Sequence, residues 1–161
     1  MVDMNNVFFD PESSLGFMSF TTNRLMASFL RRRMSQVGID LTGEQWGVMV
    51  FVWNRGEIGQ DELTHALCMD KTGMSRLLAT MEDKGLITRS PYPDDARRKV
   101  VTATQAGDAL KERSRAVAEE ALVLLLQDVS PQDHATCMRV LATVKDTLRG
   151  LDRRFAAEPA S

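Results

Sequence analysis

Residues 70–104 constrain the fold most strongly, because they encode a helix, a strand, a charged turn and a second strand in immediate succession. Asp70 is a typical helix N-cap, and apolar residues then recur at helical spacing on one face until Gly85, a residue type that often ends helices in the left-handed conformation. Residues 86–90 and 99–104 are rich in β-branched side chains, and the segment between them combines turn formers with cations. The pattern predicts a helix followed by a β-hairpin with a basic tip.

The polar face of this predicted helix is suited to contact with another surface. It carries small or hydrogen-bonding side chains and one arginine: Thr72, Gly73, Ser75, Arg76, Ala79 and Thr80. A solvated face would normally carry more Glu and Lys, so this face is suited to close approach and to hydrogen bonding with another surface. The whole chain has a net charge of −2 and a pI of about 5.7, yet residues 71–99 hold seven cations against four anions. Positive charge is therefore concentrated around the helix and hairpin.

The same stretch resembles the winged helix-turn-helix of the MarR family of bacterial transcription regulators. Four residues stand in register with the family's wing signature: Asp95, Arg97, Val101 and Thr104. Ala103 stands where the family usually has leucine, and residues 82–89 are similar to the family's exit from the recognition helix. The resemblance implies a mainly α fold with a small β-hairpin wing, in which a winged helix-turn-helix DNA-binding domain joins N- and C-terminal dimerisation helices.

The resemblance also implies roles for individual residues. The DNA-binding set is Lys71, Thr72, Ser75, Arg76, Thr80, Asp95, Arg97, Arg98 and Lys99. Arg97 would enter the minor groove at the wing tip, and Asp95 would brace the turn. Similar proteins bind small aromatic or phenolic acids where the dimerisation helices meet the wing domain. The candidate lining here is Phe20, Arg24, Trp46 and Met49, and the alternative is that these residues form packed core.

The remaining elements up to the wing follow from cap residues. Ser13 or Ser14 can begin a first helix that runs to about Val37, and residues 42–45 have the form of a capping box that begins a second, mostly apolar helix ending near Gly56. Residues 57–59 can add a minor strand, and residues 61–67 form the first helix of the helix-turn-helix. We expect residues 41–104 to be the DNA-binding region, and residues 1–40 and 105–161 to be the helical dimerisation region, in one compact unit.

The C-terminal part carries a heptad pattern. One long helix is expected from Thr104 to about Val129, and Ser130 with Pro131 then begins a last helix. That helix has apolar residues at alternating spacings of four and three, typical of a coiled-coil seam: Cys137, Leu141, Val144, Leu148, Leu151 and Phe155. The seam could pack on the chain's own first and fifth helices, but those already serve a core. We therefore favour packing between subunits, with the last five residues as dimerisation residues.

Catalytic and cofactor motifs are missing from the sequence. It has no Gly-rich phosphate loop, no nucleophile elbow and no His-x-x-x-His or Cys-x-x-Cys metal spacing, so we expect no enzyme, no metal and no cofactor. Asp61 and His65 lie one turn apart and could share a metal, although a solvated pair is the simpler interpretation. Cys68 and Cys137 are too few for a disulfide framework. Neither lies near the N-terminus, where the peroxide-sensing branch of the family keeps its reactive cysteine, so buried thiols are favoured over redox switches.

The sequence therefore predicts a homodimeric, sequence-specific DNA-binding transcription regulator that reads a pseudo-palindromic operator. A repressor released by a small aromatic or phenolic ligand is the expected form. No signal peptide or apolar span is evident, so we expect a cytoplasmic protein without membrane partners. Two alternatives remain open: a winged-helix protein-interaction module that does not bind DNA, and a thiol-based redox-sensing regulator.

Overall fold

The computed structural model describes residues 12, 14–92, 94–95 and 98–157, with side chains up to residue 152. The chain divides into two compact units, and the boundary in the sequence falls between Ala121 and Leu122, within a helix. In the part of the chain that the structure describes, no helix is both long and apolar enough to cross a membrane.

The first two helices begin and end where their cap residues predict. Helix α2 (Leu15–Gln36) begins after Ser14, whose hydroxyl accepts a hydrogen bond from the backbone of Phe17 at 3.5 Å. Helix α3 (Gly43–Arg55) opens on the predicted capping box: the Thr42 hydroxyl accepts from the Gln45 N–H at 3.2 Å, and the Gln45 side chain accepts from the Thr42 N–H at 3.1 Å. Two orphan donors are satisfied at once, so the start of α3 is defined locally.

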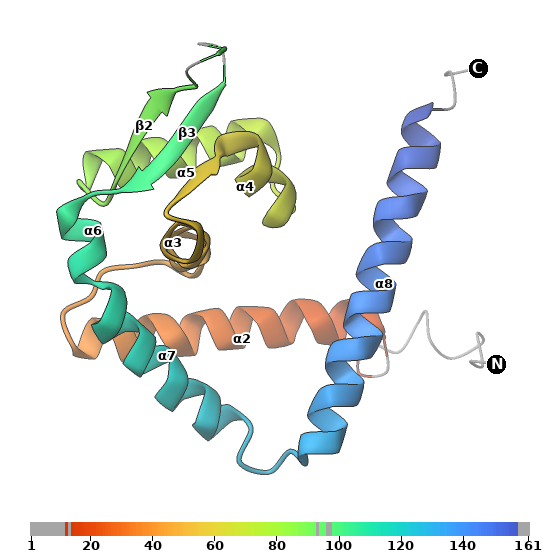
Figure 1. The fold of residues 1–161 in the computed structure, drawn as a ribbon. Helices are drawn as coiled ribbons and strands as arrows, with labels where there is room; N and C mark the ends of the chain where they lie inside the picture. Colours follow the sequence, from red (N-terminus) through yellow and green to blue (C-terminus); the bar gives the residue numbers. More distant parts are fainter. Residues whose placement is uncertain (1–11, 13, 93, 96–97, 158–161) are drawn as a thin grey trace. The chain divides into compact units, whose positions relative to one another are not determined.

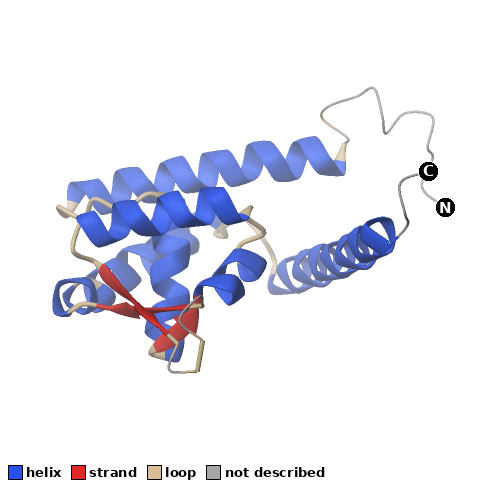
Figure 2. Cartoon of the chain, turned by 90° about the horizontal axis from the view of Figure 1, so that it is seen from above, coloured by secondary structure: helices blue, strands red, loops and turns tan. Residues whose placement is uncertain are grey.

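The helix-turn-helix and the hairpin follow α3 as predicted. Their elements are β1 (Glu57–Gly59), α4 (Gln60–Ala66), α5 (Lys71–Asp83), β2 (Ile87–Pro91) and β3 (Lys99–Ala103). The three strands form one antiparallel sheet in the order β1-β3-β2, seen as the red arrows of Figure 2. Val101 of the central strand β3 lies opposite Ile58 on one side and Arg89 on the other. Helix α3 lies between this sheet and α2 (Figure 1).

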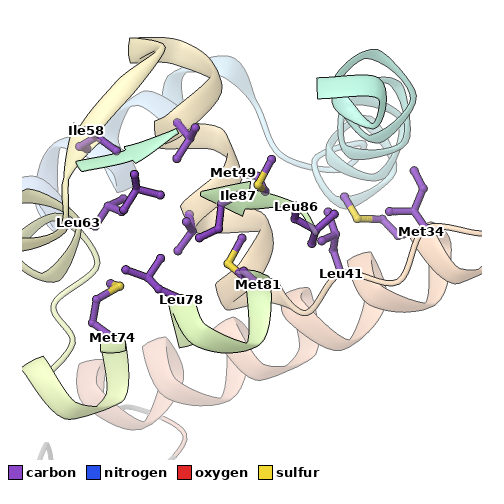
Figure 3. Close-up of a cluster of buried hydrophobic side chains, with 14 of the residues drawn as sticks. Met34, Leu41, Met49, Ile58, Leu63, Met74, Leu78, Met81, Leu86 and Ile87 are labelled. Carbon is purple, nitrogen blue, oxygen red and sulfur yellow. The ribbon is translucent and has the colours of Figure 1, made fainter. Parts of the chain in front are cut away.

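One hydrophobic core holds these elements together. Side chains from α2 to α5 and from the sheet point into a shared interior (Figure 3): Met34, Leu41, Met49, Ile58, Leu63, Met74, Leu78, Met81, Leu86 and Ile87. Three of them, Met74, Leu78 and Met81, come from one face of α5 and are 0% exposed. Each buried side chain of this size contributes about 2 kcal/mol relative to an exposed one, so the rotation of α5 about its own axis is set by the core.

The expectation of a single helix over residues 104–129 is wrong. The structure has a short α6 (Gln105–Ala109) and a separate α7 (Lys111–Leu125), with a turn at Leu110. The Leu110 N–H donates to the Gly107 carbonyl at 3.2 Å, three residues back, which tightens the chain at this point. Gly107 itself packs against the Leu86 carbonyl, which also accepts from the Thr104 N–H at 3.0 Å. Helix α6 thus packs against the start of the hairpin, and α7 begins after the turn at Leu110.

The second unit contains one long helix, α8 (Pro131–Ala157). The Ser130 hydroxyl accepts from the Asp133 N–H at 3.1 Å, which confirms the predicted start. On the predicted seam, Leu141 and Leu148 are 40% and 55% exposed in the single chain. The side chain of Phe155 lies outside the described part.

We predict that Gly107→Ala destabilises the protein. A Cβ atom at this position would overlap the Leu86 carbonyl oxygen and lie 3.1 Å from Met49 Cε, and a backbone carbonyl cannot move aside without disturbing the hairpin. The expected loss in the free energy of unfolding is about 2 kcal/mol or more, measured by chemical denaturation. Gly16→Ala is the matched control, because its nearest neighbour, Ser14 Oγ, is 4.0 Å away. Equal stability of the two variants would contradict the close approach.

Candidate nucleic-acid interface

Helix α5 presents the predicted contact residues on its exposed side. Asp70 caps the helix, with its carboxylate accepting from the Gly73 N–H at 2.8 Å. Because the apolar face is buried, the opposite face is left to solvent and holds five exposed residues of the predicted set: Lys71, Thr72, Ser75, Arg76 and Thr80. The Thr80 hydroxyl donates to the Arg76 carbonyl at 3.0 Å, so its oxygen remains available as an acceptor. This face can donate and accept hydrogen bonds along more than two turns.

The turn between α4 and α5 depends on an unusual backbone conformation. Cys68 has φ 51°, and it is the one non-glycine residue with positive φ among those that the structure describes. The Met69 N–H reaches back to the Thr64 carbonyl at 3.1 Å, which ends α4 and redirects the chain into the Asp70 cap. The side chain of Cys68 is exposed, so the expectation of a buried thiol is wrong there, and Cys137 on the α8 seam is exposed in the single chain. Cys68 is held outward by the turn, and the redox-sensing alternative stays open.

The hairpin carries two described cations beside its tip. Beyond the last strand pair, the Tyr92 N–H donates to the Arg98 carbonyl and the Arg98 N–H donates to the Asp95 carbonyl, both at 3.0 Å. The guanidinium carbon of Arg98 lies 4.4 Å from the centroid of the Tyr92 ring, and Lys99 is exposed at the start of β3. Arg97 lies outside the described residues, and the role of the Asp95 carboxylate stays a prediction.

A partly buried ion pair joins the end of α5 to the hairpin. Glu82 accepts from the Arg89 backbone N–H at 2.9 Å and from the Arg89 Nε and Nη2 atoms at 2.8 and 2.6 Å. These hydrogen bonds from Arg89 hold the pKa of the Glu82 carboxyl below its ordinary value, against the opposing effect of burial. Only 32% of the Glu82 side chain and 21% of the Arg89 side chain is exposed. The pair therefore fixes the angle between α5 and β2.

A second contact holds the same end of α5 from the other side. Lys84 Nζ lies 2.7 Å from the Asp40 carboxylate, 3.2 Å from the Asp40 carbonyl and 3.4 Å from Gln45 Oε1. The hydrogen bond from Lys84 and its charge lower the pKa of the Asp40 carboxyl. The Asp40 side chain is 81% exposed, so the ion pair adds little stability by itself, but it ties α5 to the loop before α3.

Sequence reasoning did not identify either contact as part of the site. In the sequence, Glu82 and Arg89 stand out only as part of the segment that is similar to the family's exit from the recognition helix, and nothing marks Asp40. The available signal was a pair of opposite charges on either side of the helix stop at Gly85, which lies between α5 and β2 with φ 68°. Such a stop brings the two flanking segments together, so the flanking charges can meet.

Comparison with known proteins decides the family. Residues 41–99 match the model of the MarR family. The chain is 26% identical over 137 residues to the organic hydroperoxide resistance transcriptional regulator of Bacillus subtilis, covering 85% of this chain and 90% of the relative. It is 35% identical over 71 residues to the transcriptional regulator HosA of Escherichia coli, covering 44% of this chain and 53% of the relative. The chain therefore carries a MarR-family domain.

Solved structures of MarR proteins share the fold. A probable transcriptional regulator from Pseudomonas aeruginosa superposes with a TM-score of 0.74 at 29% identity, covering 84% of this chain and 99% of that one. A mutant of MarR from Escherichia coli, crystallised with operator DNA, has a TM-score of 0.73 at 25% identity, covering 81% of this chain and 92% of that one. The predicted fold class, mainly α with a winged helix-turn-helix, is confirmed. Members of this family are transcription regulators, in agreement with the expectation that the chain is not an enzyme.

The four predicted ligand-binding residues of this MarR-family chain fall into two groups. On α2, Phe20 is 58% exposed, and the guanidinium carbon of Arg24 lies 5.6 Å from its ring centroid. On α3, the Trp46 ring packs edge-on against Trp53 at 5.7 Å, and Met49 is 0% exposed. Burial of Met49 in the single chain favours the packed-core alternative for that residue.

Asp61 and His65 both lie exposed on α4, and the described residues contain no group of three or more potential metal ligands.

We predict that Glu82→Gln destabilises the protein in a pH-dependent way. At neutral pH the loss should be about 1 kcal/mol, because a partly buried charge-assisted hydrogen-bond pair is weakened. The pKa of Glu82 is lower in the folded state than the ordinary 4.5, so its contribution is complete above pH 4.5 and disappears as pH falls through the folded pKa. Urea denaturation of both proteins between pH 7 and pH 3 should show the stability difference shrinking on acidification. A constant difference would mean that the Glu82 charge is not involved.

Proposed function

We propose that this MarR-family chain is a cytoplasmic homodimer that binds a pseudo-palindromic operator and represses transcription until a small aromatic or phenolic ligand releases it. The exposed polar face of α5 is the observation that supports DNA binding most directly. Its residues are free to reach another surface because the opposite face is locked in the core. The similar Escherichia coli MarR was crystallised with operator DNA.

The chemistry of α5 and the hairpin suits a DNA duplex. An α-helix fits the major groove, where arginine can donate two hydrogen bonds to guanine and hydroxyl groups can contact bases or phosphates. Arg76, Ser75 and Thr72 have these capacities and are exposed. Arg98 and Lys99 of the hairpin, with Arg97 as predicted, would add the cationic contacts that make binding strong and salt-dependent.

Exposed apolar surface supports the homodimer. Along α8 the seam residues Leu141, Leu148 and Leu151 are 40%, 55% and 39% exposed. On α2, Leu25 and Met18 are 71% and 47% exposed. A stable monomer rarely leaves this much apolar side chain in water. In a two-fold dimer, two α5 helices would enter successive major grooves about one helical turn apart, which requires a pseudo-palindromic operator.

The ligand proposal is supported by the pairing of Phe20 with Arg24. An aromatic acid needs a ring contact and a cation for its carboxylate, and these two side chains provide both on the exposed side of α2. Trp46 would extend the aromatic lining. Met49 is buried in the single chain, so it would not contact the ligand directly.

We predict that Arg76→Ala weakens binding to the specific operator by about 1 to 3 kcal/mol, because a donor pair on the polar face of α5 is lost. Fluorescence anisotropy with a duplex from the DNA upstream of the chain's own gene, compared with a random duplex, measures the effect. Arg115→Ala is the matched control. It removes the same charge from an exposed i,i+4 pair with Glu119 on α7 and should bind like the wild type.

Two outcomes of that titration would change the assignment. Equal losses on the upstream and random duplexes would make Arg76 a phosphate contact only. If the wild type binds neither duplex at any salt concentration, the protein-interaction alternative replaces DNA binding.

Assembly has its own prediction. Leu148→Asp places an unpaired charge in the proposed apolar interface and should raise the dimer dissociation constant by about a hundredfold or more. Light scattering across a dilution series gives the mass directly. Thr143→Asp introduces the same charge at an exposed position off the seam and should remain dimeric. A Leu148→Asp protein as dimeric as this control would exclude the seam as the interface.

A further inference from the structure

The side chain of Tyr92 spans the small sheet. Tyr92 follows β2, an edge strand, whereas Gly59 ends β1 at the other edge, with β3 between them. A Cβ atom built on Gly59 would lie 2.9 Å from the Tyr92 hydroxyl oxygen, so the phenol rests directly on the Gly59 backbone. The ring therefore connects the tip end of the hairpin to the point where the first helix of the helix-turn-helix begins.

Glycine at position 59 leaves room for this contact. Gly59 is the N-cap of α4, a position where Ser, Thr, Asp or Asn would add a capping hydrogen bond, and no side chain caps α4. Its φ of −64° and ψ of 139° are open to any residue, so backbone conformation does not explain the choice. The Tyr92 hydroxyl and Glu62 Oε1 lie 2.9 and 3.2 Å from the place of a Cβ atom at this position, so a larger residue would have to displace these two side-chain ends.

The Tyr92 ring also contacts Arg98. Its guanidinium carbon lies 4.4 Å from the Tyr92 ring centroid, the closest of the cation–π pairs described in the chain, and its carbonyl accepts from the Tyr92 N–H at 3.0 Å. A long cationic side chain on a hairpin loses rotamer freedom when it contacts DNA. Stacking removes part of that freedom beforehand and leaves the guanidinium edge able to donate.

We propose that Tyr92 is a positioning residue for DNA binding. Tyr92 stacks on Arg98 and contacts Gly59. It thereby fixes the position of the Arg98 guanidinium relative to α4 and, through the helix-turn-helix, relative to α5. The proposal rests on the proposed function, because it concerns how one DNA contact is prepared. It goes beyond it by assigning a role to Tyr92 and Gly59, neither of which contacts DNA in the scheme above.

The central test is a double-mutant cycle on the upstream duplex, measured by anisotropy at two salt concentrations. Arg98→Ala should weaken binding by about tenfold and lower the salt slope by about one ion. Tyr92→Leu should weaken binding by about twofold to fivefold, as expected when a surface cation–π contact is lost. Tyr92→Leu added to Arg98→Ala should cause no further loss, because the only contact it prepares is already gone. Tyr92→Phe keeps the ring and should bind within about twofold of the wild type.

Lys99 provides the matched control for this cycle. It is an exposed cation next to Arg98 in the chain, and its removal should also weaken binding and lower the salt slope. The losses from Lys99→Ala and Tyr92→Leu should add, since Tyr92 does not prepare Lys99. Additive losses with Arg98→Ala as well would mean that Tyr92 supports the hairpin generally, and would overturn the proposal.

A rescue experiment tests the Gly59 contact separately. Gly59→Ala should weaken binding by about as much as Tyr92→Leu, because the new methyl group displaces the phenol. Combining Gly59→Ala with Tyr92→Phe removes the hydroxyl that clashes and should restore binding, an effect that loss of folding would not show. Thermal unfolding of each variant checks that the fold is retained. If Gly59→Ala binds normally, or the combination binds no better, the Gly59 part is overturned.

Failure of the proposal can be told from failure of the proposed function. If the wild type shows no salt-dependent binding to the duplex, DNA binding itself fails and the role of Tyr92 falls with it. If the wild type binds and Arg98→Ala loses affinity while Tyr92→Leu does not, the positioning role alone is wrong.

Discussion

Burial of one face of α5 is the interaction on which the site depends. Met74, Leu78 and Met81 are 0% exposed and lie among side chains from α2, α3, α4 and the sheet. Rotating α5 about its axis would expose this apolar surface, which the hydrophobic effect opposes with several kcal/mol, or about 2 kcal/mol for each side chain. The polar face, with Arg76 and its hydroxyl-bearing neighbours, is therefore presented outward without any polar contact having to hold it there.

Core packing sets the rotation of α5, and polar contacts set the angle at its end. Glu82 binds Arg89 of β2, while Lys84 binds Asp40 in the loop before α3. The two contacts therefore connect the end of α5 to two different parts of the domain. A small β-sheet on its own would leave the hairpin free to swing relative to α5, so these directional contacts make the helix and the wing one surface.

The wing is connected to the rest of the domain a second time, through the phenol of Tyr92. Its ring meets Arg98, and its hydroxyl meets Gly59 at the start of α4. Helix α6 supports the hairpin from its base, because Gly107 allows the backbone to approach the Leu86 carbonyl. Gly107 thus allows a close backbone contact that a larger residue would prevent, and Gly59 leaves room for the Tyr92 hydroxyl.

The sequence by itself determined the elements whose signals are local. Asp70, Thr42 with Gln45, and Gly85 specify helix ends through hydrogen bonds and backbone conformations within a few residues, and the polar face of α5 follows from helical spacing alone. Only the tertiary structure decided which distant groups meet. The pairing of Lys84 with Asp40, the contact of Tyr92 with Gly59 and the break between α6 and α7 depend on how strands and helices pack. Exposure of Cys68 was equally hidden, since it follows from the direction of a turn rather than from residue type. Side-chain contacts between segments far apart in the chain have no periodic signal, because the fold brings them together.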